Sequence, residues 1–294
     1  MDRAIAPEAD SLQAELSELR TYFPERKAAA PGGVVSYREL VTVPDAPPAA
    51  GPVFVLLHGI GSGAASWLPC ARALARRVPG ARVIAWNAPG YGSSSMLAVA
   101  RPGAAAYADR LHQLAQTLDL ARFTLVGHSL GALMAAAYAA ASPAALQRLV
   151  LLGPARGYGV PARLAQGSQV AHERLATLGE LGIHGMATQR SARLLSAGAS
   201  GAQRDWVRWN MAQLNPAGYS HAVHLLCGDA IENYVRRGAA VAGQVWCGDA
   251  DVVTTPDDSR AVACQYGFPF HLIAAAGHAC YVEQPEAAAA AILN

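Results

Sequence analysis

The segment from Phe123 to Gly131, FTLVGHSLG, constrains the fold of this chain more than any other. Four apolar or β-branched residues run directly into a glycine-containing turn, and an alanine-rich segment with the composition of a helix follows from Ala132 to Ala141. This order predicts a strand, a sharp turn and a helix, with Ser129 at the apex of the turn. So tight a turn needs glycine on both sides, and Gly127 and Gly131 supply it. A serine held there projects its hydroxyl out of the sheet.

Composition limits the classes of protein to consider. With 294 residues, 52% of them apolar, the chain can bury a large core, as one domain with an insertion or as two small domains. The net charge is +2, and the basic residues are scattered, with Lys27 as the only lysine, so no nucleic-acid partner is expected. No apolar run approaches the roughly 18 residues of a membrane span. We therefore expect no membrane partner.

The cysteines and the N-terminus bear on the compartment. The five cysteines are odd in number and form no CxxC spacing, which favours reduced, mostly buried thiols. The N-terminus is charged from Asp2 and Arg3 onward and has no continuous apolar run of the kind found in a secretory signal. These features predict a soluble, cytoplasmic protein.

Residues 8 to 23 have the pattern of an amphipathic helix, with Leu12, Leu16, Leu19 and Phe23 at spacings of four and three. We expect an N-terminal helical extension over residues 1–24. Its apolar stripe must cover another surface, either on its own domain or on a second copy in a homodimer. After a loop, residues 34 to 43 have β character.

Short, nearly continuous apolar strands alternate with helical segments along the rest of the chain, which is typical of a parallel sheet covered on both faces. The expected α/β core comprises residues 25–155 and 223–294. In such sheets, ligands bind at the carboxyl ends of the strands. The expected strands are 53–57, 82–86, 123–126, 149–152, 244–247 and 270–274, and the expected helices are 68–78, 104–119, 132–141 and 283–293.

Residues 156–222 contain no strand-like run and read as a helical lid inserted in the sheet domain. Trp206, Trp209, Met211 and Met186 make an apolar substrate pocket plausible there, although such residues also form ordinary helix cores.

Three strand ends carry the chemistry. A serine hydroxyl becomes a nucleophile when a histidine takes its proton and a carboxylate orients that histidine. The sequence offers Ser129, then Asp251 in GDADVVTTP, then His278 in AAGHACYVEQPE. Asp249 and Asp229 compete for the role of the carboxylate. A second histidine near the end, His271, lies within the last expected strand.

The order serine, aspartate, histidine, together with GHSLG, resembles the α/β-hydrolase fold over roughly residues 50–294, with a mostly parallel sheet, helices on both faces and an inserted helical lid. The resemblance implies that Ser129 is the nucleophile, Asp251 the acid and His278 the general base. It also implies an oxyanion hole made by the backbone N–H groups of Leu130 and, in the HGxG loop, Ile60. No cofactor and no metal are expected.

The motif set resembles the esterase and enol-lactonase branch, which implies a small-molecule ester or lactone as substrate. C–C hydrolases of this fold commonly carry asparagine before the nucleophile and tryptophan after the catalytic histidine, whereas this chain has His128 and Ala279. Cleavage of a vinylogous diketone remains an alternative. A ligand receptor on a hydrolase scaffold is an alternative of another class.

Overall fold

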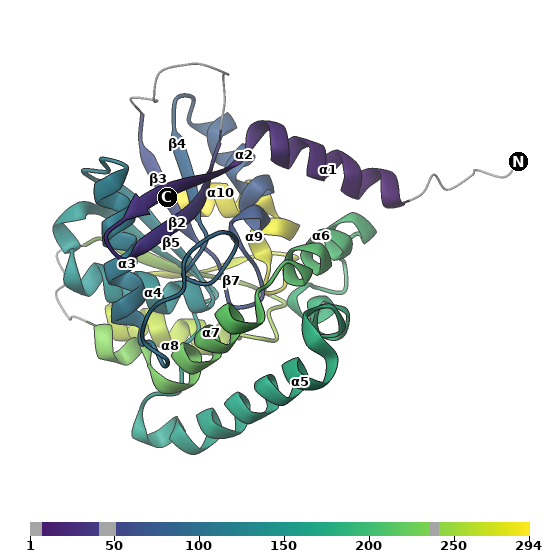
Figure 1. The fold of residues 1–294 in the computed structure, drawn as a ribbon. Helices are drawn as coiled ribbons and strands as arrows, with labels where there is room; N and C mark the ends of the chain where they lie inside the picture. The colour runs from purple at the N-terminus through teal and green to yellow at the C-terminus, as the bar shows by residue number, and fades with distance from the viewer. Residues whose placement is uncertain (1–7, 41–50, 236–240) are drawn as a thin grey trace, which may run out of the picture.

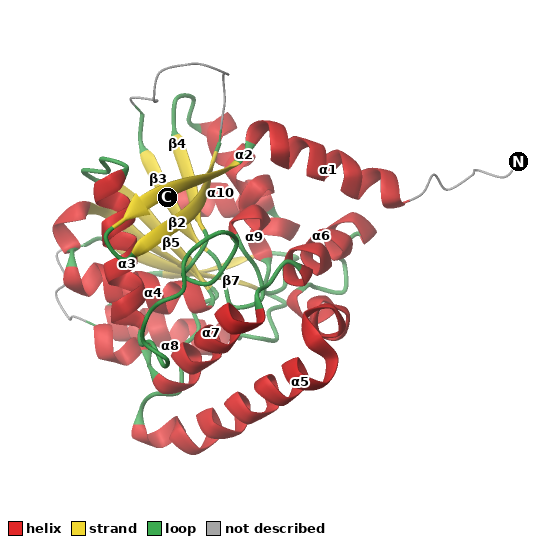
Figure 2. Cartoon of the chain, in the orientation of Figure 1, coloured by secondary structure: helices red, strands yellow, loops and turns green. Residues whose placement is uncertain are grey.

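A computed structural model describes residues 8–40, 51–235 and 241–294. Its centre is one sheet, in which eight strands of the described residues pair in the order β1-β2-β4-β3-β5-β6-β7-β8 (Figure 2). From β4 to β8 every neighbouring pair is parallel, and only the β1–β2 and β2–β4 pairs are antiparallel. The strands are β1 (Glu25–Ala30), β2 (Gly33–Glu39), β3 (Val53–Leu57), β4 (Arg82–Trp86), β5 (Phe123–His128), β6 (Leu146–Leu152), β7 (Gly243–Gly248) and β8 (Phe270–Ile273).

Side chains that alternate between the two faces of the sheet build a separate apolar core on each face. In β3, Val55 and Leu57 pack in one apolar cluster, while Phe54 and Leu56 pack in the other. Successive side chains of a strand point to opposite faces, so a continuous apolar strand needs cover on both. Helices α3 (Ala104–Thr117), α4 (Leu130–Ala141) and α8 (Pro256–Tyr266) cover the first face, and α2 (Leu68–Arg77), α9 (Cys280–Glu283) and α10 (Pro285–Leu293) the second. The expected mostly parallel α/β fold class is confirmed.

The N-terminal helix α1 (Glu8–Tyr22) packs on its own chain. Leu19 and Phe23 are buried in the same cluster as residues of α2 and α10. An ion pair between Arg72 and Glu18 also joins α1 to α2, and Figure 1 shows α1 lying along the side of the molecule near α6. The apolar stripe therefore covers the chain's own domain, and the expected homodimer stays a prediction.

One strand was not expected from the sequence. Residues 25–30, ERKAAA, form the edge strand β1, although they contain no β-branched or aromatic residue. They pair along their whole length with β2, so the neighbouring strand sets their conformation. The expected β segment at 34–43 is described only as far as residue 40, and its last three residues lie outside the described ranges.

Between β6 and β7 the chain forms the inserted helices α5 (Leu164–Arg190), α6 (Gly201–Ala212) and α7 (Pro216–Gly228), which Figure 1 shows to one side of the sheet. Helix α5 is kinked at Gly182, whose φ is 62°. The expected lid boundary at residue 222 falls inside α7, because buried Val223 and Leu225 continue its apolar face to Gly228. None of the helices in the described residues is both long and apolar enough to span a bilayer.

Candidate active site

Ser129 lies at the turn between β5 and α4 with a backbone that a side chain rarely adopts. Its φ is 54° and its ψ is −119°. Such a conformation costs of order 1–3 kcal/mol and persists only where the surroundings enforce it. Here the Ser129 N–H donates to Leu152 O at 3.0 Å, and Ser129 O accepts from the N–H groups of Ala132 and Ala155. The turn thus holds the side chain of Ser129 at the carboxyl end of β5.

Both glycines that flank this turn are sterically required. A Cβ on Gly131 would lie 2.5 Å from the carbonyl oxygen of Leu57, and one on Gly127 would lie 2.6 Å from the Cα of Ala132. Real side chains do not tolerate such contacts with backbone. The glycines therefore allow α4 to start directly against β3, as the motif predicts.

Asp251 and His278 meet beyond the ends of β7 and β8. His278 Nδ1 lies 2.8 Å from Asp251 Oδ2, and both side chains are buried. Because an ionised carboxylate only accepts hydrogen bonds, this contact places the ring proton on Nδ1 and leaves Nε2 as the basic nitrogen. The other carboxylates weighed from the sequence lie elsewhere. Asp249 is exposed and accepts from Ala276 N–H, and Asp229 bonds to Ala104 N–H and Tyr234.

The environment of Asp251 keeps it ionised. Burial by itself would raise the pKa of this carboxyl, but the charge of His278 and the hydrogen bonds from His278 outweigh that effect. The N–H groups of Val253 and Thr254 also donate to Oδ1, at 2.7 and 3.0 Å. The net result is a pKa below the usual value for an aspartate. Asp251 can therefore orient His278 and stabilise it once it gains a proton.

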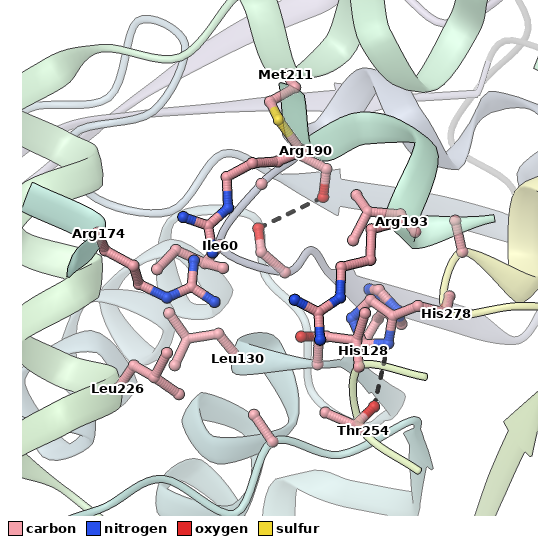
Figure 3. Close-up of a pocket in the computed structure, with 18 of the residues that line it drawn as sticks. Ile60, His128, Leu130, Arg174, Arg190, Arg193, Met211, Leu226, Thr254 and His278 are labelled. Atoms are coloured by element: carbon pink, nitrogen blue, oxygen red, sulfur yellow. Dashed lines mark hydrogen bonds between the residues drawn. The ribbon is translucent and has the colours of Figure 1, made fainter. Parts of the chain in front are cut away.

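Thr254 is a member of this cluster that the sequence did not single out. Its hydroxyl oxygen lies 3.1 Å from His278 Nδ1, 3.0 Å from Asp251 Oδ2 and 2.9 Å from Gly153 O (Figure 3). The hydroxyl can donate to one of these acceptors while its oxygen faces the imidazole N–H. A threonine three residues after the aspartate, in the same turn, was the available signal.

Two backbone N–H groups in the loops around Ser129 have no hydrogen-bond partner among the described residues. Within the described residues, neither the Ile60 N–H nor the Leu130 N–H donates a hydrogen bond. Leu130 is the first residue of α4, so its N–H also lies at the positive end of a helix dipole. The structure thus places both candidate oxyanion donors in the lining of the cavity that holds Ser129.

His58 and Tyr91 fix the loop that carries Ile60. His58 Nδ1 donates to Gly59 O at 2.8 Å, and its Nε2 accepts from Ala88 N–H at 3.1 Å. Gly59 O and the Ile60 N–H belong to one peptide group, so anchoring the carbonyl sets the direction of the N–H. Tyr91 OH donates to Ile60 O at 2.9 Å. His58 is therefore a local hydrogen-bonding residue of this loop.

His128 is the other histidine beside the turn. Its Nε2 donates to His278 O at 2.8 Å, and its ring packs on His278 with centroids 4.6 Å apart. Burial, and then the nearby His278, lower the pKa of His128 to about 3. Burial lowers the pKa of His58 to about 4. Both rings are therefore neutral at neutral pH and do not compete with His278 as charged groups.

The cavity above Ser129 has a volume of about 410 Å³. Ser129 lines this cavity. Ile60, Leu130 and His278 line it as well, together with residues of the inserted helices such as Arg174, Arg190 and Met211 (Figure 3). Among the residues suggested for a substrate pocket, Met211 and Met186 line this cavity. Trp206 and Trp209 lie outside the lining and stack on each other, with ring centroids 5.3 Å apart. The inserted helices and the 3-10 turns next to α5 contribute Arg163, Gln166, Val170, Glu173, Arg174, Met186, Arg190, Arg193, Leu194, Val207, Asn210, Met211, Tyr219 and Leu226.

Comparison with known proteins agrees with the fold. Residues 52–178 match the family model described as the alpha/beta hydrolase fold. The chain has the alpha/beta hydrolase fold. An enol-lactonase from Burkholderia xenovorans superposes on this hydrolase fold with a TM-score of 0.77 and 22% identity, over 91% of this chain and 98% of that one. An esterase from Thermogutta terrifontis superposes with a TM-score of 0.76 and 21% identity, over 92% and 96% of the two chains.

Sequence relatives match a smaller part of the chain. An uncharacterised protein of Mycobacterium tuberculosis is 38% identical over 94 residues, which is 31% of this chain and 25% of that protein. The magnesium-chelatase 30 kDa subunit of Rhodobacter capsulatus is 37% identical over 99 residues, 34% of each chain. The match thus spans a quarter to a third of the length of these relatives. It assigns no activity to this chain.

Proposed function

We propose that this chain is a serine hydrolase that cleaves a carboxylic ester or lactone through an acyl-enzyme on Ser129. The observation that carries the proposal is the 2.8 Å contact between His278 Nδ1 and Asp251 Oδ2, in a cavity that also holds the strained Ser129 turn. The esterase and enol-lactonase among the structural neighbours support it as well. In this proposal the inserted helices act as a lid that selects the substrate.

The chemistry follows from the protonation states. His278 Nε2 takes the hydroxyl proton of Ser129 as the oxygen attacks the carbonyl carbon, and Asp251 stabilises the resulting imidazolium. The Ile60 and Leu130 N–H groups bind the oxygen that gains negative charge. His278 then protonates the leaving alcohol, and the C–O bond to it breaks. Water attacks the acyl-enzyme in the same way, so that ester and water give acid and alcohol.

Substitution of the serine tests this proposal. We expect Ser129→Ala to lose at least about 1,000-fold in kcat on p-nitrophenyl butyrate, because the nucleophile is gone, while the thermal unfolding midpoint changes little. Ser220→Ala, on the outer part of α7 and away from the cavity lining, is the matched control and should keep full activity. A fluorophosphonate should label the wild type and not Ser129→Ala. Undiminished hydrolysis by Ser129→Ala would refute the assignment.

The same assay separates the alternatives. A single burst of p-nitrophenol with no further turnover would favour a ligand receptor on this scaffold over an enzyme. Rapid turnover of a vinylogous diketone, with slow turnover of esters and lactones, would favour C–C cleavage.

A further inference from the structure

Three arginines of the inserted helices line the cavity above Ser129. Arg174 and Arg190 belong to α5, and Arg193 lies in the short 3-10 turn Ser191–Leu194 that follows it. Figure 3 shows the guanidinium groups of Arg174 and Arg190 near each other, with that of Arg193 closer to His128 and His278. The cavity that holds the candidate nucleophile therefore also holds a cluster of three positive charges, which we call the arginine cluster.

The arginine cluster has no carboxylate partner in the described part of the chain. No ion pair within 4.0 Å joins Arg174, Arg190 or Arg193 to an acidic side chain there. Two further arginines of the same cavity are neutralised, since Arg156 and Arg163 both bind Glu232, at 3.0 and 2.8 Å.

The polar contacts of the cluster leave hydrogen-bonding capacity unused. Arg174 Nη1 donates to Tyr219 OH at 3.1 Å, whereas Arg174 Nε is buried without a partner among the described residues. Two carboxylates line the same cavity, Glu173 and Asp258. Glu173 is exposed and accepts from Gln169, and Asp258 lies 3.7 Å from Arg156. Neither of them forms an ion pair with an arginine of the cluster.

Holding like charges together is unfavourable unless an anion joins them. Burial, and then the positive charge of Arg174, lower the pKa of Arg190; Arg193 acts in the same direction, and Tyr219 and Glu173 offset part of the effect. A guanidinium group presents two parallel N–H donors that match the two oxygens of a carboxylate. An anionic ligand in the cavity would relieve the repulsion and use the free donors.

We propose that the substrate carries an ionised carboxylate besides its ester or lactone group, and that the arginine cluster binds this carboxylate while the reacting carbonyl lies at Ser129. This inference rests on the proposed hydrolase function. A cavity of about 410 Å³ fits a half-ester or lactone of a small dicarboxylic acid. The arginine cluster then sets specificity, since a neutral ester leaves three charges uncompensated.

A matched pair of substrates tests the inference. The mono-p-nitrophenyl ester of glutaric acid bears a free carboxylate, and its methyl-capped diester has nearly the same shape without the charge. For the wild type we expect kcat/KM to be at least about tenfold higher on the acid than on the capped ester. In Arg190→Gln and Arg174→Gln this ratio should fall by about tenfold or more, and Arg190→Lys should recover part of it. Higher salt should lower only the rate on the acid.

Arg208→Gln is the control, because Arg208 is an exposed arginine of α6 that pairs with Asp205 and lies outside the cavity lining. It should leave the ratio unchanged. Equal losses on both substrates in Arg190→Gln, or a wild type that prefers the capped ester, would overturn the inference while leaving the hydrolase function intact.

Equilibrium binding separates the two proposals. Calorimetric titration of Ser129→Ala with glutarate should show binding that Arg190→Gln weakens, whether or not the wild type hydrolyses either ester. Absence of hydrolysis with retained glutarate binding would refute only the proposed function. Binding of inorganic phosphate in place of glutarate would overturn the carboxylate assignment, and binding of neither anion would refute the arginine cluster as an anion site.

Discussion

His58 should make the stability of this protein depend on pH. Its ring is buried, and it donates to Gly59 O and accepts from Ala88 N–H, an arrangement that requires the neutral form. Burial lowers its pKa from 6.5 to about 4. A second proton on the ring would replace the acceptor that Ala88 N–H needs and would put an unpaired charge in the core.

The sign and the size of the effect follow from these two values. Between about pH 6.5 and about pH 4 the unfolded chain binds more protons at residue 58 than the folded chain, so the free energy of unfolding falls as the pH falls. From about pH 7 to about pH 5 the loss from His58 amounts to about 2 kcal/mol. The pKa of Asp251 is also lowered in the folded chain, so its effect on stability has the same sign as that of His58 but acts at lower pH. Its lowered pKa contributes stability above the usual aspartate value, which is lost only below that range.

Urea unfolding at about pH 7 and about pH 5, at constant ionic strength, measures this contribution. We expect the loss of unfolding free energy between the two conditions to be about 2 kcal/mol smaller in His58→Gln than in the wild type, because the titrating ring is gone. His128, with a pKa of about 3, contributes a similar loss to both proteins. The difference between the loss of unfolding free energy in the wild type and that in His58→Gln therefore isolates the contribution of residue 58.

Tyr91→Phe is the matched control for loop damage. It removes the hydrogen bond to Ile60 O in the same loop, and burial holds the pKa of Tyr91 far above this pH range. Tyr91→Phe should thus lower the stability at both pH values equally. A wild-type pH dependence that persists unchanged in His58→Gln would refute the buried neutral state of His58.

Two further substitutions test the turn at Ser129 and the contact between Thr254 and His278. Gly131→Ala should destabilise the protein by about 1–3 kcal/mol in thermal unfolding, since its Cβ would lie 2.5 Å from Leu57 O. Gly179→Ala on α5 is the control. Its Cβ would meet nothing within 4 Å, and the substitution should stabilise the protein by up to about 1 kcal/mol. Thr254→Val should lower kcat on p-nitrophenyl butyrate by about tenfold or more with little change in KM, and Thr254→Ser should restore it. A Thr254→Val enzyme of normal kcat would show that the hydroxyl does not position His278.

Most of the sheet was predictable because its strands are apolar on both faces and end in glycine-rich turns. The expected strands 53–57 and 82–86 coincide with β3 and β4, and the expected helix at 104–119 is α3 to within two residues. Strand β1 was missed for the opposite reason. Its sequence has low β propensity, and it is a strand only because β2 offers a free edge. A strand that forms only by pairing with a neighbouring strand leaves no recognisable pattern in its own sequence.

The candidate site residues that follow directly after a strand were predictable from the sequence. Ser129, Asp251 and His278 each follow a strand, and parallel strands bring their carboxyl ends to one edge, so their convergence follows from topology. The lining contributed by the inserted helices was not predictable in this way. Trp206 and Trp209 are the largest apolar residues predicted there, and they lie outside the cavity lining, whereas Met211 is part of it. Helical periodicity identifies an apolar face and leaves open which surface that face contacts.

Neighbouring threonines show why position in the fold decides what a side chain does. Thr255 caps α8, where its hydroxyl accepts from Asp258 N–H at 3.2 Å. Thr254, one residue earlier, points the other way and reaches His278 and Asp251. The two residues have the same chemistry and nearly the same sequence context, and the turn after β7 sends one hydroxyl to a helix end and the other to the imidazole. Orientation of the candidate base thus depends on the path of this turn as well as on the carboxylate, and the rates of the Thr254 variants measure how much.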